Sequence, residues 1–173
     1  MRKVILTSFA VCATLAFGGT VQAQAPAPAA APAGPLMYGS PGITLEQAKK
    51  ATEAAIAEAA KNNWRLAIAV TSSGGNLVHF SKMDNTQFGS IAIAIHKAKA
   101  AATFKRPTKA FADAIAASPG NVALLSLDGI IASEGGIPLT NAQGQIIGAI
   151  GCSGATGQQD GVACTAGVNA LKQ

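Results

Sequence analysis

The stretch SIAIAIHKAKAAATFKRPT, residues 90–108, decides how the rest of the chain is interpreted. Isoleucine and alanine recur in it at spacings of three and four, which is the period of a helix with one apolar face. Ser90 stands where a capping residue is expected. Pro107 ends the helix, because the residue before a proline is driven out of the α region. The sequence therefore predicts a buried central helix that ends in a basic turn.

A helix and a strand pair are predicted before this central helix. Thr44 and Gln47 have the spacing of a capping box, so a helix is expected from Thr44 to Asn62. Thr52 falls on its apolar face, where its hydroxyl could bond back to the carbonyl of Ala48. The apolar members of that face are Leu45, Ala48, Ala55, Ile56 and Ala59. The apolar run 66–70 predicts a strand covered on both faces, and the turn 73–76 leads into a second strand, 77–80.

The segments after the central helix predict more strands than helices. Thr108 is expected to cap a short helix that ends at Ala116, and residues 122–127 are either a helical turn or irregular. Strands are predicted at 129–132, 137–140 and 145–151, and glycines in the last of these imply close approach by a helix or a ligand. A closing helix, 158–171, should bury Val162, Ala166, Val168 and Leu171. Because hairpin-type turns dominate, the predicted class is α+β with a mainly antiparallel sheet.

The N-terminal region predicts export. Residues 1–3 are positively charged, residues 4–17 are apolar, and small residues precede a cleavage point after Ala23, so residues 1–23 are expected to be a signal peptide. Its apolar run is too short for a membrane span. Residues 24–42 are rich in alanine and proline and predict a disordered leader. One domain, 43–173, follows, with a periplasmic or secreted location.

Charge and cysteine content narrow the function classes. Without Arg2 and Lys3, 11 basic residues remain against 8 acidic ones, and no basic run is interleaved with aromatics. A nucleic-acid partner is therefore not expected. Cys152 and Cys164 remain in the exported chain, where disulfides persist. The spacing leaves two interpretations open, one bridge or two buried thiols.

Four stretches together carry a family resemblance. They are LAIAVTSSGGNLVHFSKMD, the central helix, SEGGIPL and the terminal GQIIGAIGCSGATGQQDGVACTAGVNAL. In this combination the chain resembles the haem-binding GlcG/HbpS-like family and is similar to the C-terminal domain of the PduO corrinoid adenosyltransferase. The adenosyltransferase activity belongs to another domain of PduO and does not carry over.

The resemblance implies a fold and an assembly. The expected fold is a profilin-like sandwich with a five-stranded antiparallel sheet, strand order 2-1-5-4-3, and helices packed on it. The last strand would then pair between the first and the fourth. The family also implies a homo-oligomer, as a dimer or a larger ring.

His96 is the candidate metal ligand. It precedes Lys97 in the part of the central helix most typical of the family, and a neutral imidazole is a good iron ligand. The functional interpretation is a haem contact, and the alternative is an exposed or interface histidine. His79 and Met83 are read as a half-exposed strand residue and a packing residue.

A cationic cluster follows His96. Lys97, Lys99 and Arg106, with Lys105, could pair with haem propionates or another carboxylated ligand. The alternative is solvated surface, or an ion pair with Glu134 or Asp160. The turn from Glu134 to Gly136 could present backbone amides to a ligand, although a simple tight turn accounts for its glycines.

These residues support three functional hypotheses. The first is an exported, non-enzymatic protein that holds haem or a related tetrapyrrole non-covalently, since no Cys-x-x-Cys-His motif is present for covalent attachment. The second is a cofactor-free structural or accessory oligomer that binds protein partners. The third is an enzyme acting on a small organic acid, with Lys97 or Glu134 as acid or base. No zinc pattern, nucleophile elbow, Walker loop or dinucleotide motif occurs.

Overall fold

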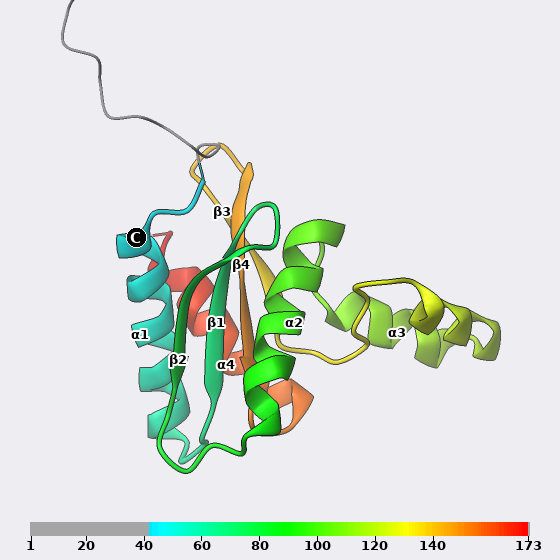
Figure 1. The fold of residues 1–173 in the computed structure, drawn as a ribbon, viewed down its shortest axis with the longest axis horizontal. Coiled ribbons are helices and arrows are strands. Elements are labelled where there is room, and N and C mark those ends of the chain that lie inside the picture. Colours follow the sequence, from blue (N-terminus) through cyan, green and yellow to red (C-terminus); the bar gives the residue numbers. More distant parts are fainter. Residues whose placement is uncertain (1–41, 173) are drawn as a thin grey trace, which may run out of the picture. The chain divides into compact units, whose positions relative to one another are not determined.

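The computed structural model describes residues 42–172 (Figure 1). The predicted signal peptide and nearly all of the predicted leader lie outside the described residues and stay predictions. The elements are α1 (Leu45–Lys61), β1 (Ala67–Ser72), β2 (Leu77–Lys82), α2 (Gly89–Phe104), α3 (Lys109–Ala117), the 3₁₀ helix η1 (Pro119–Ser126), β3 (Gly136–Thr140), β4 (Ile146–Ser153) and α4 (Gly157–Ala170).

The sheet has four antiparallel strands in the order β2-β1-β4-β3. The α+β class is confirmed, and so is the prediction that the last strand pairs between the first strand and its own hairpin partner. The five-stranded prediction is wrong, because residues 129–132 form no strand. Gly129 has a left-handed φ of 81°, and Ile130 is buried as part of a loop. Without that strand, the predicted order 2-1-5-4-3 becomes the observed one.

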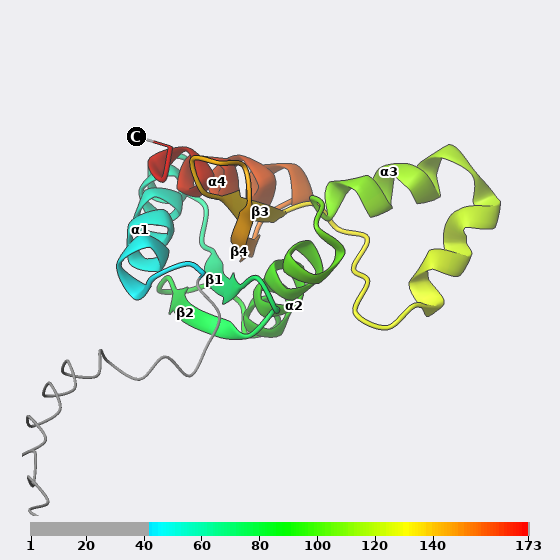
Figure 2. The ribbon, with the colours of Figure 1, turned by 90° about the horizontal axis from the view of Figure 1, so that it is seen from above.

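Helices cover both faces of the sheet (Figures 1 and 2). On one face α1 and α4 pack on the large side chains Ile68, Val70 and Ile150. On the other face α2 packs on Ala67 and Ala69 of β1. Because neighbours along a strand point to opposite faces, β1 is buried on both sides, as its apolar run predicts. The alanine side lets α2 approach the sheet closely.

Gly151 in β4 marks the closest approach. A Cβ there would collide with the carbonyl oxygen of Ala94 and the amide nitrogen of Ala98, both in α2. The predicted close approach at the glycines of this strand is thus confirmed, and at Gly151 the approaching element is a helix.

The two terminal helices begin as expected but bury different residues. The capping box of α1 forms, with Thr44 and Gln47 exchanging hydrogen bonds of 3.0 and 3.1 Å. Leu45, however, is exposed, and the Thr52 hydroxyl is buried without a hydrogen-bond partner, so the bond to Ala48 that it could make does not form. In α4, Val162 is exposed, contrary to prediction. The buried residues of α4 are Asp160, Gly161, Ala163, Cys164 and Gly167.

The ends of α2 also differ from expectation. The helix starts at Gly89, so Ser90 lies inside it, and its hydroxyl has no partner. The helix ends at Phe104, because Lys105 turns left-handed with φ 56° before Pro107 is reached. The Lys105 ammonium then donates to the Ser73 carbonyl at 2.8 Å, and this bond holds the left-handed turn against the β1–β2 hairpin.

After α2 the chain forms an arm, residues 109–128, which contains α3 and η1. The arm extends away from the sheet in both views (Figures 1 and 2). At its root the Phe111 ring meets the edge of Phe104, with 5.4 Å between centroids. Residues 122–126 lie in η1, which settles the open interpretation of residues 122–127 in favour of a helical turn.

The part of the chain between residues 42 and 172 contains no helix that is both long and apolar enough to cross a bilayer.

We expect Gly151→Ala to lower the free energy of unfolding by about 1–3 kcal/mol, because the added methyl group has to push α2 away from β4. Gly89→Ala is the matched control, since a Cβ at Gly89 meets nothing within 4 Å. That substitution should be neutral or slightly stabilising. Urea unfolding of both variants checks this, and equal effects would contradict the packing argument.

Candidate functional site

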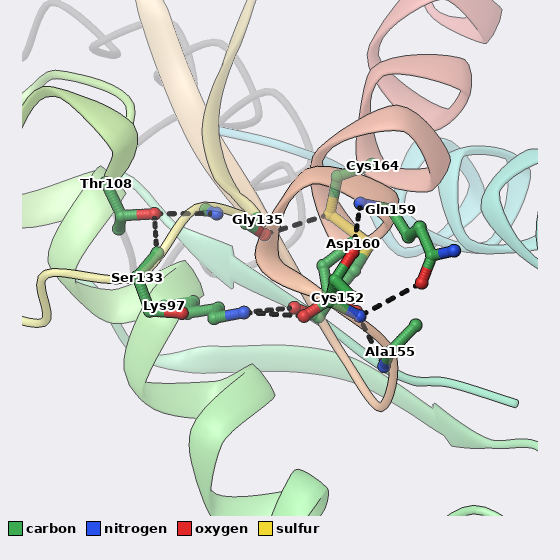
Figure 3. A network of polar contacts seen from close by, with 11 residues as sticks. Lys97, Thr108, Ser133, Gly135, Cys152, Ala155, Gln159, Asp160 and Cys164 are labelled. Atoms are coloured by element: carbon green, nitrogen blue, oxygen red, sulfur yellow. Dashed lines mark hydrogen bonds and ion pairs between the residues drawn. A yellow bond between two sulfur atoms is a disulfide. The ribbon is translucent and has the colours of Figure 1, made fainter. Parts of the chain in front are cut away.

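Lys97 does not point to solvent. Its side chain leaves α2 toward the end of β4, and the residue is 1% exposed. The ammonium group donates to Asp160 Oδ2 at 2.8 Å and to the Cys152 carbonyl oxygen at 3.1 Å (Figure 3). Buried charges in proteins are paired and hydrogen-bonded, and this pair meets that requirement.

Asp160 is the acidic half of the pair and is 2% exposed. It lies in the first turn of α4, whose N-terminus is closed by a capping box between Thr156 and Gln159. Its Oδ1 accepts a hydrogen bond from the Ala155 amide at 3.1 Å. Burial raises the pKa of the Asp160 carboxyl, and the hydrogen bond and charge of Lys97 act in the opposite direction.

The turn from Ser133 to Gly136 covers the ion pair. Thr108 Oγ1 donates to the Ser133 carbonyl at 2.6 Å and accepts from the Gly136 amide at 2.9 Å. Thr108 was expected to cap α3, but it makes no capping bond there, because its hydroxyl is engaged by this turn. Figure 3 shows the hydroxyl between the two groups.

The two glycines of this turn are required by packing. Gly135 has φ +120°, and a Cβ on it would lie 2.8 Å from both the Asp160 Cβ and the Cys152 carbonyl oxygen. A Cβ on Gly136 would collide with the backbone of Lys97. The amide of Gly136 is used by Thr108, and the carbonyl of Gly135 accepts from the Cys152 amide at 2.8 Å. The structure therefore favours the tight-turn interpretation of these glycines.

A disulfide joins Cys152 in β4 to Cys164 in α4, with 5.8 Å between the Cα atoms. Of the two interpretations open from the sequence, the bridge is the one that forms. Cys164 lies one helical turn after Asp160, so the bridge and the ion pair fasten neighbouring turns of α4. The Cys164 sulfur also lies 3.2 Å from the Gly135 carbonyl oxygen.

The predicted site residues do not lie together in the structure. His96 follows the outward face of α2 and is half-buried, and Lys99 on the same side is exposed. Arg106 is exposed, with its guanidinium 5.8 Å from the Phe111 ring centroid. Glu134 is half-buried against Gly161, at the start of α4. Since successive helical residues are rotated by about 100°, Lys97 points inward while its neighbour His96 points outward.

Of the interpretations given to Lys97, the structure shows the ion pair with Asp160. From the sequence, Asp160 was predicted only as a possible ion-pair partner of the cationic cluster. Its burial could have been inferred from its position, because it is the one charged residue of α4 and lies four residues before Cys164. The assignments of His96, Lys99, Arg106 and Glu134 to a ligand stay predictions.

Three hollows of the described surface lie away from the predicted site residues. One, of about 610 Å³, is lined by residues of the start of α1 and of the β3–β4 hairpin, among them Thr44, Gln47, Asn141 and Ile147. Two smaller ones, of about 410 and 330 Å³, share lining residues with it. His96, Lys97, Lys99, Arg106 and Glu134 line none of the three. Residues 42–172 also contain no group of three or more His, Cys, Asp or Glu placed to hold a metal ion.

Comparison with known proteins identifies the family. The family model described as "Haem degrading protein HbpS-like" matches residues 43–169. The chain belongs to this family. Protein GlcG of Escherichia coli K12 is 38% identical over 96 residues, which is 56% of this chain and 69% of GlcG.

Solved structures of similar proteins have the same fold. A double mutant of HbpS from Streptomyces reticuli is 32% identical with a TM-score of 0.69, and the match covers 86% of this chain and 99% of that one. The protein ORFY of Klebsiella pneumoniae is 29% identical with a TM-score of 0.69, covering 80% and 98%. A PduOC:heme complex, at 21% identity and a TM-score of 0.68, covers 75% and 95% and supports the fold alone.

We expect Asp160→Asn to lower the free energy of unfolding by about 3–5 kcal/mol, because it leaves the Lys97 ammonium buried without an opposing charge. Asparagine keeps an oxygen for the Ala155 amide, so the loss reports the ion pair. Adding Lys97→Met removes the stranded charge and should recover most of the loss. Urea unfolding of the wild type, both single variants and the double variant measures the coupling.

The exposed pair Lys109–Asp113 supplies the control for this cycle. Its N–O distance is 2.6 Å, yet both side chains are more than half exposed, so Asp113→Asn should change stability little. Losses that add without recovery in the Lys97→Met/Asp160→Asn double variant would contradict the interpretation of a coupled pair.

Proposed function

We propose that this protein is exported and holds haem or a related tetrapyrrole non-covalently, as a binding protein and not as an enzyme. The observation that carries the proposal is the family match over residues 43–169, in a family described by haem chemistry. The resemblance of this chain to HbpS at 32% identity over nearly the whole of that protein adds support.

The outward face of α2 offers the residues for such a ligand. His96 is half-buried there, and a neutral imidazole can bind iron. Ala92, one turn before it, is exposed, and its small side chain leaves room for a flat ring on that side. Lys99 is exposed on the same side and can meet a carboxylate, and Arg106 follows at the end of the helix.

Lys97 has a structural role in this proposal. The Lys97 ammonium donates its hydrogen bonds to Asp160 and to the Cys152 carbonyl. It therefore fixes the rotation of α2 and does not reach a ligand on the outer face. The same burial argues against the enzyme hypothesis with Lys97 as an acid or base, since a substrate cannot approach an ammonium that is 1% exposed.

One observation favours the second hypothesis, a cofactor-free oligomer that binds protein partners. His96 lines none of the three hollows described above, while the arm exposes Val122, Leu125 and Leu127. Large exposed apolar side chains that gather in one place mark interaction surfaces. Self-association and haem binding are compatible, so we propose that the protein is a homo-oligomer in either case.

Haem titration of the purified protein, followed by the Soret band, tests the proposal. We expect a defined stoichiometry, and His96→Ala should change the position of the Soret band and weaken binding at least about tenfold. Lys99→Gln should weaken binding without altering the band. The matched control is His79→Ala, because His79 pairs with Val70 on the face that packs on α1.

The outcomes separate the function from the ligand assignment. A Soret shift that survives in His96→Ala unchanged removes His96 as the iron ligand and leaves haem binding in place. A wild-type protein that takes up no haem at any ratio contradicts the function itself.

A further inference from the structure

Asp128 and Gly129 form an Asp-Gly pair at the point where the arm returns to the body. Asp128 is exposed, and both residues lie in a turn that the Ile130 amide closes by donating to the Leu127 carbonyl at 3.3 Å. Gly129 has φ 81°, the left-handed value that glycine supplies at the third position of such a turn. Ile130 directly after it is 8% exposed. The pair therefore joins the solvated arm to a buried residue of the body.

The main-chain nitrogen of Gly129 is free to react with the Asp128 side chain. Within residues 42–172 this nitrogen donates no backbone hydrogen bond, and the ion pairs of the same residues do not include the Asp128 carboxyl. Glycine has no Cβ that would block an approach to its own nitrogen. Rotation about the Asp128 Cα–C bond brings the side-chain Cγ within reach of this nitrogen. A surface turn between helices and strands allows that rotation more readily than a helix does.

The reaction open to this pair is an intramolecular dehydration. The Gly129 nitrogen attacks Asp128 Cγ, the N–Cγ bond forms, the Cγ–OH bond breaks, and the amide proton leaves with the hydroxyl group as water. The product is a five-membered succinimide. Water then adds to one of the two ring carbonyl carbons. Breaking the N–Cγ bond restores aspartate, whereas breaking the bond from nitrogen to the main-chain carbonyl carbon gives isoaspartate. Water is the one reactant that the chain does not itself supply.

A second Asp-Gly pair, Asp160–Gly161, has the opposite environment. It lies inside α4, and Asp160 is 2% exposed. Lys97 holds one carboxylate oxygen at 2.8 Å and the Ala155 amide holds the other at 3.1 Å (Figure 3). A Cβ on Gly161 would lie 2.6 Å from Glu134 Oε1, so this segment also lacks space to rearrange. The same dipeptide is thus exposed in a turn at one place and fixed in the core at the other.

We propose that Asp128–Gly129 is a modification site, at which the folded protein converts Asp128 to isoaspartate through a succinimide. In isoaspartate the main chain runs through Cβ and Cγ, so it gains one methylene inside the Leu127–Ile130 turn. The lengthened turn cannot keep its closing hydrogen bond in the present geometry, and it displaces Ile130 from its buried position. The modification therefore loosens the junction between arm and body. It needs neither haem nor the oligomer proposed above.

Prolonged incubation of the purified protein at neutral pH tests the site. After unfolding and reduction, the chain is digested with a protease that cleaves before aspartate but not before isoaspartate. We expect cleavage before Asp128 to fall with incubation time, to about half its starting value or lower, while cleavage before Asp160 stays constant. An isoaspartyl methyltransferase with a labelled methyl donor should report methyl uptake that rises with the same time course.

Two substitutions of Asp128 supply matched controls. Asp128→Glu keeps the charge, but its ring closure needs a six-membered ring that forms much more slowly, so it should abolish methyl uptake. Asp128→Asn should take up methyl groups at least about tenfold faster, because the carboxamide loses ammonia more readily than the carboxyl group loses water. Both substitutions fall on an exposed residue, so both variants should fold like the wild type, as far-UV circular dichroism checks.

The outcomes separate the site from its effect on the arm. Constant cleavage before Asp128 without methyl uptake, or an Asp128→Asn variant that reacts no faster, overturns the modification site. Equal losses of cleavage before Asp128 and Asp160 overturn the claim that the fold selects between the two pairs. Hydrogen exchange around Ile130 should become faster in the incubated wild type and not in Asp128→Glu. Equal exchange in the two overturns the loosening and leaves the site in place.

Discussion

The ion pair between Lys97 and Asp160 holds the two helical layers of this domain together at one end of the sheet. α2 and α4 lie on opposite faces, and the pair joins them beside the last residues of β4. Burying an ammonium and a carboxylate costs several kcal/mol for each ion, and their attraction offsets this only when the remaining bonds are also made. Here the Cys152 carbonyl serves Lys97 and the Ala155 amide serves Asp160.

Several other features around the pair follow from the need to exclude water from it. The Gly135–Gly136 turn closes over the ammonium, Thr108 holds that turn in place, and the disulfide keeps the middle of α4 against β4. Each of them would be unremarkable alone. Together they fix the rotation of α2, because rotating the helix by one residue, about 100°, would carry Lys97 out of reach of Asp160. The outward position of His96 is therefore set by a contact on the opposite side of the helix.

Local signals in the sequence predicted the elements well, and tertiary contacts decided the rest. The Thr44–Gln47 box and the glycine turn before β2 depend on neighbours a few residues away, so they were readable. Ser90 and Thr108 have the same capping chemistry, but one lies inside α2 and the other bonds a turn 25 residues later. The strand expected at 129–132 failed because a four-residue apolar run does not tell a strand from a buried loop.

The alanine-rich composition of α2 did not indicate which side of the helix faces the sheet. Alanine occupies both its sheet side and part of its outer side, so periodicity alone did not show that Lys97 points inward. A lysine and a histidine in adjacent positions were interpreted as one site, whereas the helix turns them to different sides.

The position of His96 on the outer face of α2 limits how far the protein can enclose a ligand there. Protein sites usually bury most of a ligand's surface. The outer face of one helix covers only one side of a flat tetrapyrrole. If haem binds at His96, its second wall has to come from another segment or another copy.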